Sequence, residues 1–232
     1  MHILSFDTSS SDLHVSLLVD RQPVLERTIL PAGAERQEVA SVLMMEVDRA
    51  FCDAGWSKSQ PNLVVVGIGP GSFTGIRVAV ITARTICQIF HLPLIGVSLL
   101  ETLYFAAGSA EPAAILLPST SNQFFYGAFE RTEADPVREI VRQASGPADA
   151  LLSQLSGIPT WFGATQSSSL LQEHELEPLP KLKNIGTLQA QLAFDRLSLN
   201  GFSTETFAWQ NVLPLYLRSP SVTIKKNYAA PD

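Results

Sequence analysis

The sequence predicts an α/β protein of two lobes, each built on a mixed β-sheet that is flanked by helices. Short runs of β-branched residues alternate with segments of helical periodicity. The segment 1–107 follows the order β-β-β-α-β-α-β-α. A polar segment with glycine and proline, 108–112, comes next, and strands then open the following part as they opened the first. We therefore expect an N-terminal lobe over residues 1–107 and a C-terminal lobe over residues 108–232.

Strand-like segments begin the chain. The run Ile3–Phe6 is apolar, and 13–19 alternates between apolar and polar residues, which is typical of a strand with one apolar face. With a third strand over Val24–Leu30, these segments predict two adjacent hairpins, and hence an antiparallel edge on a mixed sheet. A helix fits the apolar spacing from Glu35 to Ala54, and we expect Gly55 to end it.

A strand, a glycine turn and a helix form the stretch around which we expect the chain to be organised. The run Leu63–Val66 is apolar and β-branched, as in strands that are buried on both faces. Four glycines and a proline then fall within 67–75. Apolar residues follow at helical spacing, namely Ile76, Ala79, Val80, Ala83, Cys87 and Phe90.

The later elements are predicted from weaker patterns. A strand over Leu92–Val97 and a helix to Ala107 complete the first lobe, and Ser98 with Glu101 has the spacing of a capping box. The second half predicts, in order, strands over 113–117, 123–130 and 137–142, a helix over 148–155, a strand over 159–163, a helix that starts near Ser167, a helix through Leu188 and Leu197, and a last strand over 211–217. We expect the tail from residue 219 to be mobile.

Two interpretations of the glycine turn stay open. Its glycines permit close approach of another group, and a helix N-terminus offers free N–H groups to an anion. The turn matches neither a Walker A loop nor a G-x-G-x-x-G fingerprint, so it can equally serve to pack strand against helix. The Asp7-Thr8-Ser9 run after the first strand can likewise meet phosphate or metal, or form a local turn. The candidate nucleotide- or phosphate-binding residues are Asp7, Thr8, Gly69, Gly71, Ser72, Thr74 and Arg77.

The helix after the turn is apolar on a second side as well. Between Ile76 and Phe90 its charged residues are Arg77 and Arg84. A helix of this kind needs cover on both sides, from its own sheet and from a second layer or a second chain. Met44 and Met45 widen the apolar stripe of the helix before it, although such methionines more often belong to an ordinary core. The candidate partner-interface residues are Met44, Met45, Val78, Ile81, Thr85 and Ile89.

Composition and spacing disfavour several classes of function. A net charge of −6 and a pI near 5.2 provide no overall basic field for nucleic acid. Cys52 and Cys87 fall in apolar helical stripes, so we expect buried free thiols. No leader or apolar run of transmembrane length is evident, which predicts a cytoplasmic protein. The histidines lack metal-ligand spacing and no nucleophile motif is present, so we expect neither a metal site nor catalytic residues.

Several motifs give the chain a resemblance to a known family. They are Ile3–Ser9, Gly69-Pro70-Gly71-Ser72-Phe73-Thr74-Gly75-Ile76-Arg77, Leu92–Ser98 with Glu101, and Leu213–Arg218. The chain resembles the TsaB (YeaZ) family, bacterial proteins of tRNA threonylcarbamoyladenosine (t6A) synthesis. The resemblance extends over the whole chain and is dense through about Leu103.

The resemblance implies an actin-like ATPase (ASKHA, ribonuclease H-like) fold and a non-catalytic paralogue of the transferase TsaD. Helices of the first lobe would form a homodimer or, alternatively, the heterodimer with TsaD, which TsaE then joins as the ATPase. Binding of tRNA would be indirect, through the complex. No cofactor of its own is implied; an ATP or ADP molecule would sit at the junction with TsaD, near Gly69 to Arg77, if this subunit takes part in nucleotide binding.

The chain also departs from the family pattern. Leu117-Pro118-Ser119-Thr120 stands where family members usually have a strand that runs into Asp-Ala-Arg, which puts a ligand role of the second lobe in doubt. The alternative function is a small-molecule kinase or ATPase of the same fold, with Asp7 at the phosphates. A metallopeptidase, a label sometimes given to relatives of TsaD, lacks the ligands that it would need.

Overall fold

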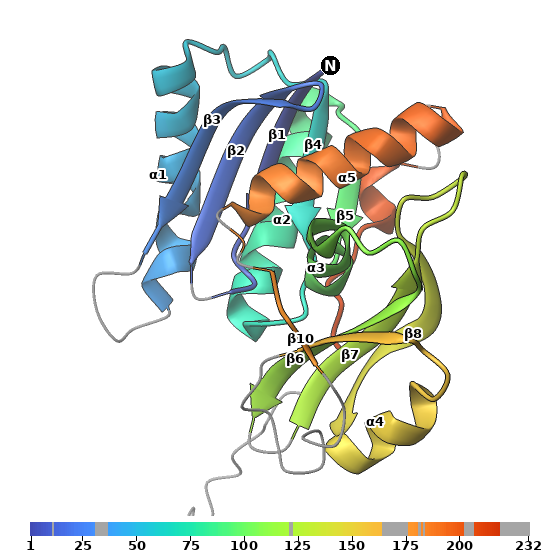
Figure 1. Ribbon diagram of the computed structural model, residues 1–232. Helices are drawn as coiled ribbons and strands as arrows, with labels where there is room; N and C mark the ends of the chain where they lie inside the picture. Colours follow the sequence, from blue (N-terminus) through green and yellow to red (C-terminus); the bar gives the residue numbers. More distant parts are fainter. Residues whose placement is uncertain are drawn as a thin grey trace, which may run out of the picture.

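The chain forms two five-stranded sheets that lie one above the other in the view of Figure 1. The computed structural model describes residues 1–10, 12–30, 37–120, 123–163, 176–180, 182, 184–201 and 207–218. In the chain, the segment 108–112 lies between α3, the last element in sequence before the second sheet, and the first strand of that sheet, and helices flank both sheets. The boundary of the lobes at residue 107 stays a prediction, because a helix from the last part of the chain packs on the first sheet.

The first sheet follows the predicted order of elements. Its strands are β1 (His2–Asp7), β2 (Leu13–Val19), β3 (Gln22–Ile29), β4 (Leu63–Gly67) and β5 (Leu94–Val97), and its helices are α1 (Gln37–Ala54), α2 (Phe73–Phe90) and α3 (Leu99–Ala107). The spatial order is β3-β2-β1-β4-β5, with antiparallel pairing through β1, β2 and β3 and parallel pairing of β1, β4 and β5. The expected antiparallel edge on a mixed sheet is therefore confirmed.

The second sheet repeats this plan with other elements. It contains β6 (Ala113–Thr120), β7 (Gln123–Glu130), β8 (Arg138–Pro147), β9 (Thr160–Gly163) and β10 (Glu177–Pro178). In the chain, α4 (Ala148–Gln154) lies between β8 and β9, and α5 (Ile185–Asn200) follows β10. Three antiparallel strands are again joined by two parallel ones, in the order β10-β9-β6-β7-β8. This repetition is the one that the sequence pattern predicts.

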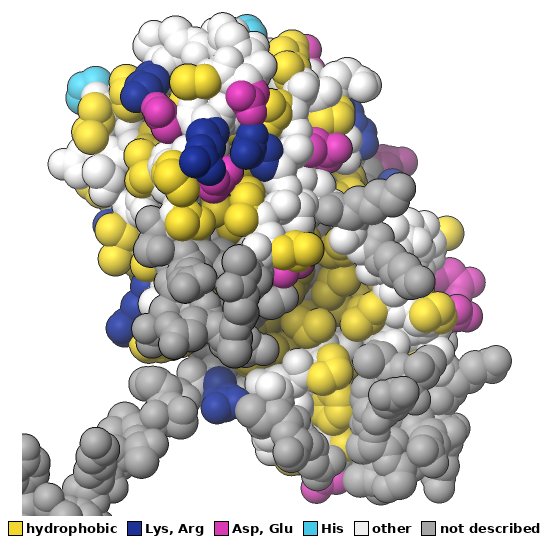
Figure 2. All heavy atoms as spheres, turned by 90° about the vertical axis from the view of Figure 1, so that its left-hand side faces the viewer, with side chains coloured by type: hydrophobic (Ala, Val, Ile, Leu, Met, Phe, Trp, Pro, Cys, Tyr) yellow, Lys and Arg dark blue, Asp and Glu magenta, His cyan; other side chains and the backbone are white. Residues whose placement is uncertain are grey.

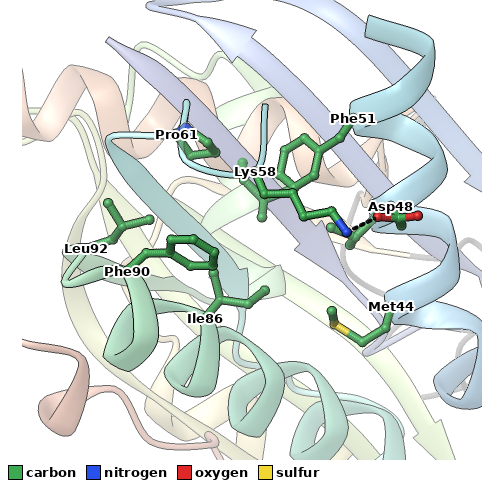
Figure 3. A pocket seen from close by; sticks show the side chains of 10 residues that line it. Met44, Asp48, Phe51, Lys58, Pro61, Ile86, Phe90 and Leu92 are labelled. Atoms are coloured by element: carbon green, nitrogen blue, oxygen red, sulfur yellow. Dashed lines mark ion pairs between the residues drawn. The ribbon is translucent and has the colours of Figure 1, made fainter. Parts of the chain in front are cut away.

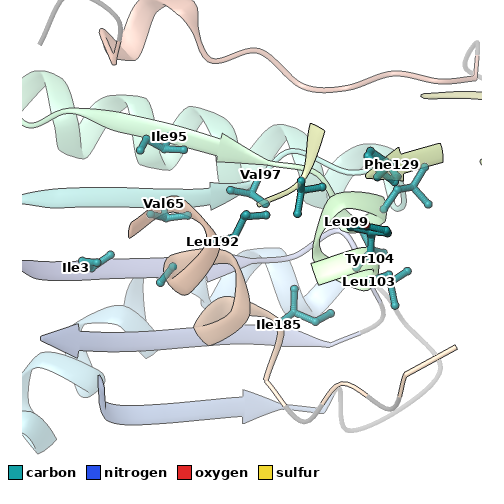
Figure 4. Packing of buried hydrophobic residues seen from close by; sticks show 14 of the residues in the cluster. Ile3, Val65, Ile95, Val97, Leu99, Leu103, Tyr104, Phe129, Ile185 and Leu192 are labelled. Carbon is teal, nitrogen blue, oxygen red and sulfur yellow. The ribbon is translucent and has the colours of Figure 1, made fainter. Parts of the chain in front are cut away.

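Helices cover both faces of the first sheet because its central strands alternate between two apolar cores. Leu4 and Phe6 of β1 point to the side of α1 and α2, where they are fully buried. Ile3 points to the opposite side, toward α3 and α5, and Figure 4 shows it in the same cluster as Val65 and Leu192. All of β4 is buried, as expected for a strand between two helical layers.

Helix ends follow the chemistry that the sequence indicates. Gly55 has a φ of +67°, and Trp56 N–H donates to the Phe51 carbonyl at 2.9 Å, a Schellman ending for α1. Ser98 and Glu101 form the predicted capping box of α3, with distances of 2.8 and 3.0 Å between the backbone nitrogens and the side-chain oxygens.

The predicted last strand over 211–217 is wrong. Trp209–Asn211 forms a short 3₁₀ helix, η2, and no strand is assigned from Val212 to Arg218. Here Pro214 has no N–H to give, and the hydrogen bonds go to separate places: Leu215 N–H donates to the Ile68 carbonyl, and the Leu217 carbonyl accepts from Ser145 Oγ. The helix expected near Ser167 and the tail from residue 219 lie outside the described residues.

One of the two cysteines is not where we expect it. Cys87 is fully buried on the inner face of α2, and this burial raises the pKa of its thiol to about 12. Cys52 is exposed, because it lies on the side of α1 opposite Leu43, Val47 and Ala50, which fill the core.

From the sequence we expect no apolar segment of transmembrane length, but α2 is long and apolar enough to cross a membrane. Its 18 residues have a mean hydropathy of 1.3. One such helix is weak support for a membrane span, because core helices pass the same test. Ala79, Val80 and Ala83 of α2 are buried against the first sheet, as in a core helix.

A layer of polar side chains separates the first sheet from the start of α5. Asn184 caps α5 through Thr187 N–H at 3.2 Å and accepts from Ser16 Oγ at 2.7 Å. His14 lies on the same face of β2 as Ser16. It pairs in register with Asp7 of β1, and it is 4% exposed. Burial lowers the pKa of His14, although the charges of Asp7 and Asp12 act in the opposite direction.

This burial predicts acid sensitivity. Because the pKa of His14 is lower in the folded protein than its ordinary value of about 6.5, its contribution to stability is complete above about pH 6.5 and is lost on acidification. Replacing His14 by Gln should therefore reduce the loss of unfolding free energy between about pH 7 and about pH 5. Urea unfolding of the wild type and the variant at both pH values measures this difference. An equal pH dependence of the two would contradict the lowered pKa of His14.

Candidate functional site

The glycine turn packs directly on the Asp7-Thr8-Ser9 turn. A Cβ at Gly71 would lie 2.0 Å from the Ser9 carbonyl oxygen, and one at Gly75 would lie 2.0 Å from the Thr8 carbonyl oxygen. Ser72 N–H donates to the Ser9 carbonyl at 2.7 Å, and Thr8 Oγ1 donates to the Gly75 carbonyl at 2.7 Å. These glycines are therefore needed because two backbones meet with no room for a side chain.

Asp7 is fully buried, and both of its oxygens accept hydrogen bonds from the same chain. Oδ1 accepts from the N–H and the Oγ of Ser9, both at 2.6 Å, and Oδ2 accepts from Gln189 Nε2 of α5 at 2.7 Å. A Cβ at Gly67 would lie 1.6 Å from Oδ2. Asp7 thus connects the end of β1 to β4 and α5, and it forms the local turn that was one of its two predicted roles.

The other candidate phosphate ligands have separate roles in the fold. Ser72 caps α2 by accepting from Gly75 N–H at 3.2 Å, while the side chain of Thr74 is exposed. The Gly69 carbonyl accepts from Leu99 N–H at 2.7 Å. The turn therefore performs the packing role, and binding of a phosphate or nucleotide by these residues stays a prediction.

Arg77 is exposed and lies against aromatic rings. Its guanidinium carbon is 4.0 Å from the centroid of the Phe73 ring and 5.6 Å from that of Tyr216. Its Nε donates to the Tyr216 hydroxyl at 2.7 Å, and the two rings are 4.7 Å apart. A residue from the end of the described chain thus orients this guanidinium.

The six candidate interface residues lie on α1 and α2, and most of them are exposed. Met44 and Met45 are 54% and 44% exposed, and Ile81 and Ile89 are 63% and 64% exposed. Thr85 is exposed with its hydroxyl donated to the Ile81 carbonyl, and Val78 is partly buried. Exposed apolar side chains of this size are typical of contact surfaces. We refer to Met44, Met45, Val78, Ile81, Thr85 and Ile89 as the docking surface.

An apolar pocket opens between α1 and α2 beside the docking surface. In Figure 3, Met44 and Phe51 of α1 face Ile86 and Phe90 of α2 across it. It encloses about 440 Å³ of space, part of it open to solvent, and the Asp48–Lys58 ion pair at 2.7 Å forms part of its lining. Figure 2 shows this side of the molecule, where hydrophobic side chains lie next to a group of charged ones.

The sequence patterns did not indicate several residues of these sites. Gln189 and Tyr216, the partners of Asp7 and Arg77, are distant along the chain, and no local pattern marks such pairs. Phe90 follows the same helical spacing as the buried Ile76, Ala83 and Cys87, but it is 40% exposed and lines the pocket. Among the residues that the structure describes, no three His, Cys, Asp or Glu side chains come together as metal ligands would.

Comparisons with known proteins agree on one family. The family model described as TsaD, tRNA N6-adenosine threonylcarbamoyltransferase, matches residues 24–218. The tRNA threonylcarbamoyladenosine biosynthesis protein TsaB of Escherichia coli (strain K12) is 29% identical over 94% of this chain and 95% of its own. A tRNA N6-adenosine threonylcarbamoyltransferase of Streptococcus sanguinis (strain SK36) is 28% identical over 48% of this chain and 37% of its own. The solved structure of YeaZ from Pseudomonas aeruginosa has a TM-score of 0.69 and 22% identity, over 93% of this chain and 99% of that one.

The repeated mixed sheets and the similarity to the YeaZ structure define a protein of the actin-like ATPase (ASKHA, ribonuclease H-like) fold. Because the family model covers well over half of the 232 residues, the chain belongs to the TsaD family, and its similarity along nearly all of E. coli TsaB places it among the TsaB (YeaZ) members. The family resemblance and the fold expected from the sequence are both confirmed.

The glycine turn provides a test of this packing. Changing Gly71 to Ala should lower the free energy of unfolding by about 2–4 kcal/mol, because the new methyl group overlaps the Ser9 carbonyl. The matched control is Gly146→Ala, where the nearest atom would be 3.6 Å from the new carbon. Urea denaturation compares the two, and equal stability of both variants would show that the turns are not packed so closely.

Proposed function

We propose that this chain is a non-catalytic subunit in t6A biosynthesis that binds TsaD through the docking surface and supports its activity. One observation carries the proposal: α1 and α2 already contribute one face to the core, yet each presents large apolar side chains to solvent. Covering Met44, Ile81 and Ile89 in a complex would remove this apolar area from water, at roughly 25 cal/mol per Å². TsaD is the partner of choice because both its family model and TsaD sequences match this chain.

The non-catalytic assignment is supported by the state of Asp7. In the alternative function, a small-molecule kinase or ATPase, this carboxylate would act at the phosphates. Here both of its oxygens accept bonds from Ser9 and Gln189 in the interior of the chain. An active enzyme would have to break this buried arrangement to use Asp7, which would leave polar groups without partners.

The proposal also includes a second copy of the chain, tRNA, TsaE and a nucleotide. In the absence of TsaD, a second copy of the chain would cover the docking surface, giving a homodimer. The net charge of −6 leaves tRNA to the other subunits, so that this chain reaches tRNA only within the complex, in the cytoplasm. TsaE joins as the ATPase, and any ATP or ADP lies at the junction with TsaD.

The docking surface is tested by placing a charge in it. Changing Ile89 to Glu should weaken binding of TsaD from the same organism by about 100-fold or more, because a carboxylate would be buried with no cation one turn away on α2. Light scattering coupled to size-exclusion chromatography should show a one-to-one complex for the wild type and separate proteins for the variant.

The matched control is Ile140→Glu, which changes another exposed isoleucine, 38% exposed on β8 of the second sheet. This variant should bind TsaD as the wild type does. Normal binding of TsaD by the Ile89 variant would contradict the assignment of the surface.

The non-catalytic assignment has its own test. The isolated chain, incubated with ATP and Mg²⁺, should release no phosphate above the rate of an Asp7→Asn variant, because Asp7 serves the structure and not a reaction. Turnover by the wild type that disappears in this variant would favour the kinase or ATPase function. Circular dichroism should accompany the assay, since Asp7→Asn removes buried hydrogen bonds.

A further inference from the structure

Arg77 extends the docking surface along α2. Arg77, Ile81, Thr85 and Ile89 follow one another at intervals of four residues and therefore form one row on the helix. All four are exposed. A partner that covers Ile81 and Ile89 therefore also meets the guanidinium at the start of the row.

The segments that surround Arg77 differ in charge from the chain as a whole. The chain carries a net charge of −6, but it has no Asp or Glu in 54–100 or in 207–218. These two ranges contain β4, α2 and β5, together with the segment that packs on them. Arg77 and Arg84 are the charged residues of α2, so this helix carries positive charge and no carboxylate.

On α1, the carboxylates whose side chains the structure describes already have cationic partners. Asp48 pairs with Lys58 at 2.7 Å, and Glu46 and Asp53 both pair with Arg27, at 3.0 and 2.5 Å. In contrast, within the part of the chain that the structure describes, no carboxylate lies within 4.0 Å of the Arg77 or Arg84 guanidinium. Both instead stack on rings, Arg84 at 5.5 Å from the centroid of Trp209.

The geometry of Arg77 leaves its outer nitrogens for another group. One face of the guanidinium is against Phe73, and Nε is used by the Tyr216 hydroxyl. The two terminal nitrogens form a fork that matches a carboxylate. If a partner covered this charge without supplying an anion, the loss of water around it would oppose binding.

We propose that the partner presents an Asp or Glu side chain to Arg77, from a segment whose neighbouring side chains are apolar and cover Ile81 and Ile89. This inference rests on the proposed function and specifies the chemistry of the TsaD segment that binds. Leu213, three residues before Tyr216 in the chain, is another large apolar residue that is exposed, at 61%. Arginine and aromatic residues within an apolar surface are the composition of energetically important interface centres.

A protein partner fits this surface better than a nucleic acid. Binding along a phosphate backbone relies on several cations in series, and its strength follows their number. Here the row continues from Arg77 into Ile81, Thr85 and Ile89, which offer nothing to phosphate. The whole chain is also acidic.

The experiment compares the binding of TsaD by four full-length proteins, by calorimetry at about 50 mM and about 300 mM salt. They are the wild type, Arg77→Met, Arg77→Lys and the control Arg142→Met, an exposed arginine of β8 with no ion pair among the described residues. Arg77→Met should weaken binding about tenfold at low salt, and its affinity should depend less on salt than that of the wild type. Arg77→Lys should retain part of the affinity, and Arg142→Met should bind as the wild type.

Wild-type affinity and salt dependence in Arg77→Met would overturn the inference. If Ile89→Glu still abolished binding, the proposed function would stand without the role of Arg77, whereas normal binding by both variants would remove the docking surface as well. A third measurement titrates the isolated proteins with tRNA. Loss of tRNA binding in Arg77→Met, with TsaD binding unchanged, would also overturn the inference, in favour of a nucleic-acid contact.

Discussion

The contact between two backbone turns, Asp7–Ser9 and 67–75, determines how the rest of the first sheet is assembled. No side chain separates the turns, since the space at Gly71 and Gly75 is taken by carbonyl oxygens of Thr8 and Ser9. The contact sets the direction in which α2 leaves β4, and Asp7 extends it to α5 through Gln189. Because hydrogen bonds between buried groups cost most when they are broken, the region is fixed as a unit.

The position of α2 follows from this constraint, and it leaves one side of the helix to the sheet and the other to solvent. Ala79, Val80 and Ala83 are buried on the sheet, and the small alanines bring the helix close to it. The opposite row, from Arg77 to Ile89, therefore faces outward along its length. A helix with this much apolar exposure would be a liability in a protein that acts alone, and it becomes useful when another chain covers it.

Local patterns and long-range contacts differ in how far the sequence reveals them. The strand at 63–67, the capping box of Ser98 and the ending of α1 at Gly55 depend on neighbouring residues, and the structure agrees with the prediction for each. The segment 211–217 has an apolar pattern typical of a strand, yet its hydrogen bonds go to Ile68 and Ser145 instead of a neighbouring strand. Cys52 shows the same limit, since periodicity places it near an apolar stripe without saying which flank meets the core.

The sequence by itself determined the order of the elements in the first sheet, the repeat of one sheet plan in two halves, the family and the row of apolar residues that α2 exposes. These properties depend on periodicity, on glycine and on motifs that are read along the chain. Only the tertiary structure decided which distant partners Asp7 and Arg77 bind. Asp7 meets Gln189 and Arg77 meets Tyr216 because folding joins segments that are far apart in the chain, and in both pairs the choice of partner depends on which groups the packed backbone leaves within reach.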